Sequence, residues 1–147
     1  MGWVDKIAGQ LVVIDTAPII YFIEEHPTYL PVVLPFFEAL DQQTVSGATS
    51  TITLIEVLIQ PLRQNKRNLV RQYREILTNV SGLTTHALTP EIAEIAADLR
   101  AKHNLRVPDA VQMATGIQAG AQYFLTNDAR LPDLPNLKRL LVNDYRS

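Results

Sequence analysis

The chain has 147 residues, 47% of them apolar, which is enough to bury the core of one globular domain spanning residues 1–147. It contains no cysteine, which excludes a disulfide framework, a thiolate metal site and a thiol nucleophile. The formal net charge of −2 argues against nucleic-acid binding by bulk positive charge, yet residues 1–60 have a charge of −6 and residues 61–147 a charge of +4.

Strand-like and helix-like segments alternate along the chain. The predicted strands cover residues 11–14, 44–48, 83–87, 122–126 and 139–143. The predicted helices cover residues 17–25, 29–41, 50–60, 66–79, 90–104 and 108–119. Because the first strand, LVVI, is apolar throughout, this order predicts an α/β domain, a three-layer α/β/α sandwich with a mainly parallel central sheet of about five strands.

The apolar stretches are too short to indicate a membrane segment. Asp15, Glu56 and several prolines interrupt them, so none approaches the roughly 20 residues that span a bilayer. The first ten residues lack the apolar region of a signal peptide. We therefore expect a cytoplasmic protein with no membrane association.

Two aspartates lie just beyond the ends of predicted strands. Asp15 comes after LVVI and Asp128 comes after YFLTN. Ligands of parallel α/β sheets bind beyond the carboxyl ends of the strands, so both side chains are expected at the same edge of the sheet. Each also has an ordinary structural interpretation, Asp15 as the N-cap of the next helix and Asp128 as a turn residue.

Two further acids lie near predicted helix starts. Glu56 belongs to STITLIEVLI, a helix that is apolar on nearly every side and is therefore predicted to be buried, where an unpaired carboxylate is costly. A capping box formed by Thr53 and Glu56 is the structural alternative. Asp109 opens the helix PDAVQMATG, and either a functional role or a favourable interaction with the helix dipole explains it.

These four acids can converge if the predicted topology is right. Carboxylates gathered at one point raise one another's pKa, so the arrangement makes sense chiefly around a cation. Oxygen ligands without cysteine suit Mg²⁺ or Mn²⁺, which bind well beside phosphate oxygens. Other α/β chemistries lack their motifs: no second Asp lies two residues after Asp15, no glycine-rich turn follows the first strand, and G-x-S-x-G does not occur.

Three stretches of the sequence resemble the PIN-domain ribonucleases, in particular the small stand-alone toxins of the VapC type. The stretches are VIDTAPIIYFIE, STITLIEVL and PDAVQMATGIQAGAQYFLTND, and the last is the most specific. The resemblance extends from about Leu11 to Val142 and agrees with the predicted order of elements.

The resemblance implies an endoribonuclease that hydrolyses RNA phosphodiester bonds with water activated by Mg²⁺ or Mn²⁺. The residues that match the family's catalytic and metal-binding acids are Asp15, Glu56, Asp109 and Asp128. Those that match its supporting hydroxyl positions are Thr16 and Thr126. A VapC-type protein is the toxin of a toxin–antitoxin pair, so the expected partners are an RNA substrate, a small antitoxin protein and a second copy of the chain in a homodimer.

Two other functions stay open on the sequence alone. One is a catalytically degenerate PIN-like protein-interaction module, in which the acids serve only as helix caps. The other is a DNA-directed structure-specific nuclease, because the same metal chemistry would serve it.

A run of basic residues, RQNKRNLVRQYR, is the expected RNA-binding surface. If the run is one continuous helix, four arginines fall within an arc of about 80°. These arginines are Arg63, Arg67, Arg71 and Arg74. Arg106 is a further candidate for phosphate contact, and Tyr21 or Tyr73 for stacking on a base. A solvated helix face is the alternative meaning of the basic run.

Overall fold

The computed structural model describes residues 2–147 and contains one five-stranded sheet with the order β3-β2-β1-β4-β5. The strands are β1 (Leu11–Ile14), β2 (Ser46–Ser50), β3 (Leu83–His86), β4 (Tyr123–Thr126) and β5 (Lys138–Leu141). Each neighbouring pair is parallel. The prediction of a mainly parallel sheet of about five strands is confirmed.

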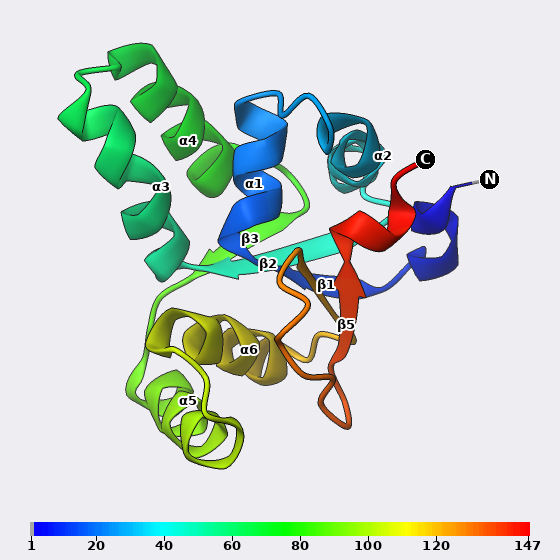
Figure 1. Ribbon diagram of the computed structural model, residues 1–147, viewed down its shortest axis with the longest axis vertical. Coiled ribbons are helices and arrows are strands. Elements are labelled where there is room, and N and C mark those ends of the chain that lie inside the picture. The colour runs from blue at the N-terminus through cyan, green and yellow to red at the C-terminus, as the bar shows by residue number, and fades with distance from the viewer. Residues whose placement is uncertain (1) are drawn as a thin grey trace.

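Helices cover both faces of this sheet. The α-helices are α1 (Thr16–Ile23), α2 (Leu30–Asp41), α3 (Thr51–Arg63), α4 (Arg67–Asn79), α5 (Pro90–His103) and α6 (Val107–Ala119). Short 3₁₀ helices, η1 (Trp3–Ile7) and η2 (Val142–Tyr145), lie near the two ends of the chain. Helices α1 to α4 lie on one face and α5 and α6 on the other (Figure 1), which confirms the α/β/α sandwich. Within residues 2–147 no helix is both long and apolar enough to cross a membrane.

The central strand β1 is buried on both faces, as its continuous apolar sequence predicts. Val12 and Ile14 pack into the core beneath α1 to α4, whereas Val13 packs into the core beneath α5 and α6. All three side chains are fully buried. Successive side chains of a strand point to opposite faces, so an all-apolar strand requires a helix layer on each side.

The order of the strands creates a crevice beside β1. From β1 the chain continues to β2 and β3 on one side of it, then returns to form β4 and β5 on the other side. The connections that leave β1 and β4 therefore go to opposite faces of the sheet, and the space between them is where ligands bind in such folds. Asp15 follows β1 and Asp128 follows β4, so both acids lie at this crevice.

Two element boundaries differ from the prediction because residues there serve other elements. The strand expected at 44–48 is β2, Ser46–Ser50, since the backbone N–H groups of Thr44 and Val45 both donate to the Ala39 carbonyl and close the end of α2. The strand expected at 139–143 ends at Leu141, and η2 begins with Val142.

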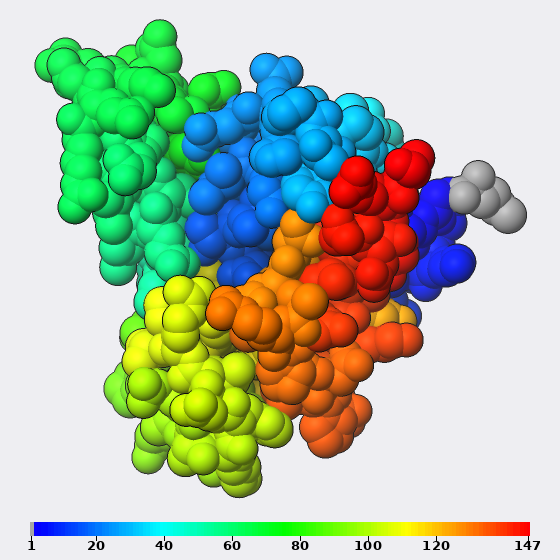
Figure 2. Space-filling view, in the orientation of Figure 1, coloured from blue at the N-terminus to red at the C-terminus, as the bar shows by residue number. Residues whose placement is uncertain are grey.

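The structure excludes the structural alternative considered for Glu56 and contradicts one prediction about the helix at 50–60. Its N-cap is Ser50, whose hydroxyl accepts the Ile52 N–H at 3.1 Å, so Thr53 and Glu56 form no capping box. The helix is also not buried all round, because α3 and α4 project from the body as a hairpin (Figure 2) and only one side of α3 meets the core. The side chains left exposed are Ile55 (62%), Ile59 (42%) and Leu62 (59%).

Candidate metal-dependent active site

Asp15 lies where β1 ends and α1 begins, and both of its carboxylate oxygens are hydrogen-bonded. One oxygen accepts the Thr16 N–H at 2.9 Å, so Asp15 is indeed the N-cap of α1. The other accepts the Thr126 hydroxyl at 2.7 Å, from the end of β4. The cap and the site are thus formed by the same side chain, and Thr126 joins two neighbouring strands at the crevice.

The electrostatic environment of Asp15 is unfavourable for its charge. Its pKa is raised to about 6, chiefly by burial and to a smaller extent by the negative charges of Asp109 and Glu56. The hydrogen bonds from Thr126 and Thr16 oppose this rise without cancelling it. Glu56 and Asp109 therefore lie close enough to repel Asp15, as the predicted convergence of the acids requires.

Glu56 reaches the same site from the second turn of α3. Its carboxylate accepts the Thr16 hydroxyl at 2.6 Å. Thr16 thus bonds to Asp15 through its backbone and to Glu56 through its side chain. The hydroxyl groups of the two predicted residues, Thr16 and Thr126, each donate a hydrogen bond to one acid.

A buried polar network beneath the acids was not predicted from the sequence. The Gln112 amide donates to the Thr53 hydroxyl, which bonds the Thr49 hydroxyl at 2.9 Å, and Thr49 in turn donates to the Ile14 carbonyl at 2.9 Å. The side chains of all three polar residues are fully buried. The network ties α6, α3, β2 and β1 together directly below Thr16. Its only sequence signal is a glutamine on an otherwise apolar face of α6, three residues after Asp109.

Asp109 lies in the first turn of α6 and is paired with an arginine. Its side chain is buried, with 6% of the residue exposed, and its carboxylate accepts from Arg106 Nε at 3.1 Å. The hydrogen bond to Asp109 raises the pKa of Arg106. Arg106, predicted as a phosphate contact, therefore lies at the edge of the acid cluster.

Asp128 is also paired with an arginine, Arg130, which was not predicted from the sequence as a site residue. One oxygen accepts from the Arg130 backbone N–H and from Nε, both at 3.0 Å, and the other accepts from Nη2 at 2.9 Å. The Arg130 guanidinium holds the pKa of Asp128 below its usual value. Only its position two residues after Asp128 in the sequence could have suggested this pair.

Asp109, Asp128 and their two arginines line one small cavity of about 170 Å³ between the α5–α6 turn and the loop after β4. Within residues 2–147, no three carboxylate or imidazole side chains already stand close enough to enclose a metal ion. The donor set nevertheless fits a hard cation. All four acids supply oxygen, and Asp15 has repulsive acidic neighbours and neutral donors in place of a counter-ion.

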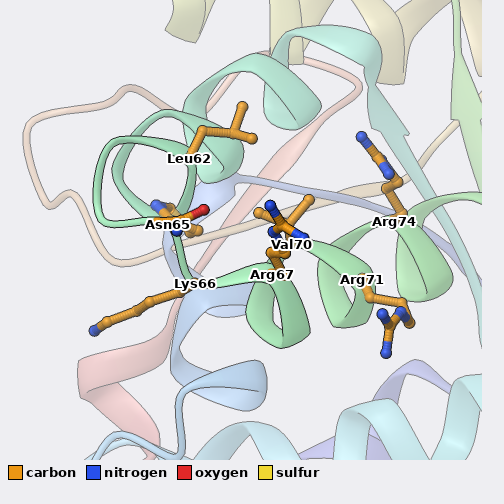
Figure 3. A pocket seen from close by; sticks show the side chains of 8 residues that line it. Leu62, Asn65, Lys66, Arg67, Val70, Arg71 and Arg74 are labelled. Carbon is orange, nitrogen blue, oxygen red and sulfur yellow. The ribbon is translucent and has the colours of Figure 1, made fainter.

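The predicted basic stripe is interrupted. The helix ends between α3 and α4, where Asn65 adopts a left-handed backbone conformation. Arg63 therefore belongs to a different helix from the other three arginines. Those three, on α4, line a cavity of about 300 Å³ at the hairpin turn, together with Leu62 and Lys66 (Figure 3). The stripe is therefore a basic hollow at the tip of the hairpin. Its arginines are Arg67, Arg71 and Arg74.

The two tyrosines proposed for base stacking have other contacts. Tyr73 is fully buried and its hydroxyl donates to Glu24, which fastens α4 to the end of α1, so the stacking role predicted for it is wrong. Tyr21 stacks on Tyr29 with ring centroids 4.8 Å apart and accepts the Asn127 side-chain N–H at 3.1 Å. Its ring lies near the site with one face already covered.

The fold is that of a doubly wound α/β protein, and acids from four different elements lie around the crevice where the strand order reverses. The family model of the PIN domain matches residues 12–137. The chain therefore belongs to the PIN domain family.

Several solved structures share this fold. VapBC2 from Rickettsia felis, bound to a DNA fragment of its promoter, matches with a TM-score of 0.70 at 19% identity, over 89% of this chain and 98% of that one. DNA-bound VapBC from Salmonella typhimurium matches with a TM-score of 0.71 at 15% identity, over 90% of this chain and 98% of that one. VapC20 of Mycobacterium tuberculosis, a toxin that cleaves the sarcin–ricin loop, matches with a TM-score of 0.63 at 15% identity, over 77% and 86%. No curated protein matches the sequence significantly.

Proposed function

We propose that this protein is an endoribonuclease that depends on a divalent cation, Mg²⁺ or Mn²⁺. The observation that supports this best is the state of Asp15, an enclosed carboxylate whose pKa is raised by burial and by two neighbouring acids. Negative charge gathered in this way is destabilising unless a cation binds there. Membership of the PIN domain family and the fold shared with a sarcin–ricin loop cleaving toxin point to RNA as the substrate.

In this proposal the four acids would hold the metal, which would supply an activated water at neutral pH. The acids are Asp15, Glu56, Asp109 and Asp128. The chain's own contribution is to orient them: Thr126 and the Thr16 N–H fix the Asp15 carboxylate, and the Thr16 hydroxyl fixes Glu56. The buried network of Thr49, Thr53 and Gln112 keeps Thr16 in place from below.

The RNA strand is proposed to extend from the acids along α3 toward the basic hollow. Glu56 and Leu62, at the edge of the hollow, are six residues apart on α3, which corresponds to about 9 Å along the helix axis. Arginine and lysine at the hollow would bind backbone phosphates without reading the base sequence. Replacing Arg67 and Arg71 together with alanine should weaken RNA binding most at low salt, and an unchanged affinity at all salt concentrations would contradict this path.

We further propose that the protein is the toxin of a toxin–antitoxin pair and forms a homodimer. The structural neighbours include complexes of this kind, among them a toxin–antitoxin complex from Klebsiella pneumoniae. The exposed apolar side chains of α3, spaced at i, i+4 and i+7, form a surface suited to a protein contact. A monomeric mass in sedimentation at micromolar concentration would contradict the homodimer. An adjacent gene for a small DNA-binding protein would support the antitoxin.

Cleavage assays separate this function from its alternatives. Labelled single-stranded RNA and DNA of matched sequence are incubated with the protein and Mn²⁺, with EDTA as the control. The expected result is EDTA-sensitive cleavage of RNA, which Asp109→Asn abolishes and Asp98→Asn, an exposed change on α5, leaves intact. Cleavage of DNA alone would indicate the DNA-directed nuclease, and no cleavage of varied RNAs would indicate the interaction module.

A further inference from the structure

The four acids divide into two kinds according to what holds them. Asp15 and Glu56 accept hydrogen bonds from neutral hydroxyl and amide donors. Asp109 and Asp128 accept from guanidinium groups. A cation that binds Asp15 and Glu56 therefore displaces no positively charged side chain. The charges of Asp109 and Asp128, in contrast, are already neutralised by arginines of the same chain.

Arg130 is held at Asp128 alone and faces solvent. Its guanidinium makes two hydrogen bonds to the carboxylate, yet 81% of its side chain is exposed. Exposed ion pairs contribute little to stability, so this pair opens at little cost to the fold. A divalent cation brings a larger charge to the same carboxylate and can displace the arginine.

The displaced guanidinium would remain at the mouth of the acid cluster. Arg106 and Arg130 line the same cavity as Asp109 and Asp128, and the positive charge of Arg130 acts on Arg106. The planar fork of arginine that fits a carboxylate through two hydrogen bonds also fits a phosphate. Two arginines beside carboxylates that hold a metal are well placed for a polyanionic substrate.

We propose that Arg130 exchanges partners, covering Asp128 in the free protein and binding an RNA phosphate next to the cleaved bond once a divalent cation has taken Asp128. This inference rests on the proposed ribonuclease function and adds a substrate-binding residue to it. Arg106 flanks the same phosphate position from the start of α6.

The displacement of Arg130 from Asp128 by a divalent cation is tested by calorimetric titration of the metal-free protein with Mn²⁺ alone. Arg130→Ala removes the competitor, so its Mn²⁺ dissociation constant should fall by up to about fivefold relative to the wild type. Arg130→Lys keeps the charge but cannot make the two parallel hydrogen bonds, so its Mn²⁺ dissociation constant should lie between those of the wild type and Arg130→Ala. The control is Lys102→Ala, which removes one positive charge from an exposed pair with Asp98 at 3.0 Å, and Lys102 is not among the residues that line the cavity.

The binding of Arg130 to an RNA phosphate is tested by steady-state cleavage of RNA at saturating Mn²⁺. A phosphate contact made equally in the ground state and the transition state affects binding alone, so Arg130→Ala should raise KM about tenfold and leave kcat nearly unchanged. Arg130→Lys should recover part of the loss, and Lys102→Ala should match the wild type.

The outcomes separate this inference from the proposed function. A wild type that does not cleave RNA overturns the function and the RNA half of the inference, while the metal titration still tests the other half. A wild type that cleaves, together with an Arg130→Ala variant whose Mn²⁺ affinity or KM is unchanged, overturns the partner exchange alone. Thermal unfolding of each variant in EDTA verifies that the exposed substitution leaves the fold intact.

Discussion

At the scale of single residues, Asp15 combines a structural and a chemical role. Its carboxylate caps α1 through one oxygen and is tied to β4 through the other, while burial and two nearby acids oppose its charge. A helix cap alone needs none of this enclosure, since N-caps are ordinarily solvent-accessible and worth about 1 kcal/mol. The enclosed charge therefore has a measurable consequence for stability.

Without metal, Asp15→Asn should stabilise the protein above pH 6. The folded pKa of about 6 lies above the ordinary value of 3.8, so protonation favours the folded state. The stabilising effect of this proton is fully present below pH 3.8 and is lost as the pH rises through 6. A difference of about two pKa units corresponds to at most about 3 kcal/mol.

The measurement is urea unfolding in EDTA from pH 4 to pH 8. The free-energy difference between Asp15→Asn and the wild type should grow with pH and level off above 6, whereas the exposed control Asp98→Asn should show no such trend. Equal dependence on pH in Asp15→Asn and the wild type would mean that Asp15 is a simple cap.

At the scale of elements, the contact between α6 and β1 depends on a glycine. A Cβ atom at Gly116 would lie 2.5 Å from Val13 Cγ1 and 3.0 Å from Val13 Cβ. The absence of a side chain lets α6 lie directly on the central strand. This close approach sets the position of Asp109, at the start of α6, relative to Asp15, at the end of β1.

Gly116→Ala should therefore destabilise the protein although alanine favours a helix over glycine by about 1 kcal/mol. Overpacking against a buried strand costs about 1 to 3 kcal/mol, so we expect a net loss of about 1 kcal/mol in the free energy of unfolding. Val13→Ala would make room for the new methyl group, and the double variant should be more stable than the sum of the two single changes predicts. A stability gain from Gly116→Ala alone would disprove the close packing.

At the scale of the whole molecule, the candidate site and the basic hollow occupy different places, although the site takes acids from both the acidic and the basic half of the sequence. The acids gather at the crevice, and the basic hollow lies at the tip of the α3–α4 hairpin, which projects from the body (Figure 2). The hairpin is held by the Tyr73–Glu24 hydrogen bond and by apolar residues of α3 and α4 in the core beneath. A cation site and a phosphate-binding surface on one molecule suit a nucleic-acid substrate.

Divalent cations should stabilise the entire fold. At a free metal concentration about one hundred times the dissociation constant, binding contributes about 2.7 kcal/mol, which raises the melting temperature of a domain of this size by several degrees. Mn²⁺ should act at lower concentration than Mg²⁺, because it generally binds more tightly and tolerates less regular geometry. KCl at matched ionic strength is the control for screening. Identical melting curves in MnCl₂, MgCl₂ and KCl would argue against a metal site.

The order of the elements, and the edge of the sheet at which Asp15 and Asp128 lie, could be predicted from local sequence patterns. The all-apolar LVVI required a strand covered on both faces, and an acid placed directly after such a strand emerges where parallel strands end. Periodicity also located the helices, because the spacing of apolar residues along a helix follows from its geometry. These are local properties, set within one element and its immediate neighbours.

The groups that hold each acid, and the helix faces that stay exposed, depend on contacts between distant parts of the chain and could not be predicted in this way. The Thr126–Asp15 hydrogen bond joins residues 111 positions apart, and Gln112 meets Thr53 across 59 positions. The apolar pattern of α3 indicated burial, but burial depends on whether another layer covers the helix, and this hairpin projects into solvent. The arginine partners of Asp109 and Asp128 lie close in sequence, yet their pairing depends on loop conformation, which periodicity does not specify.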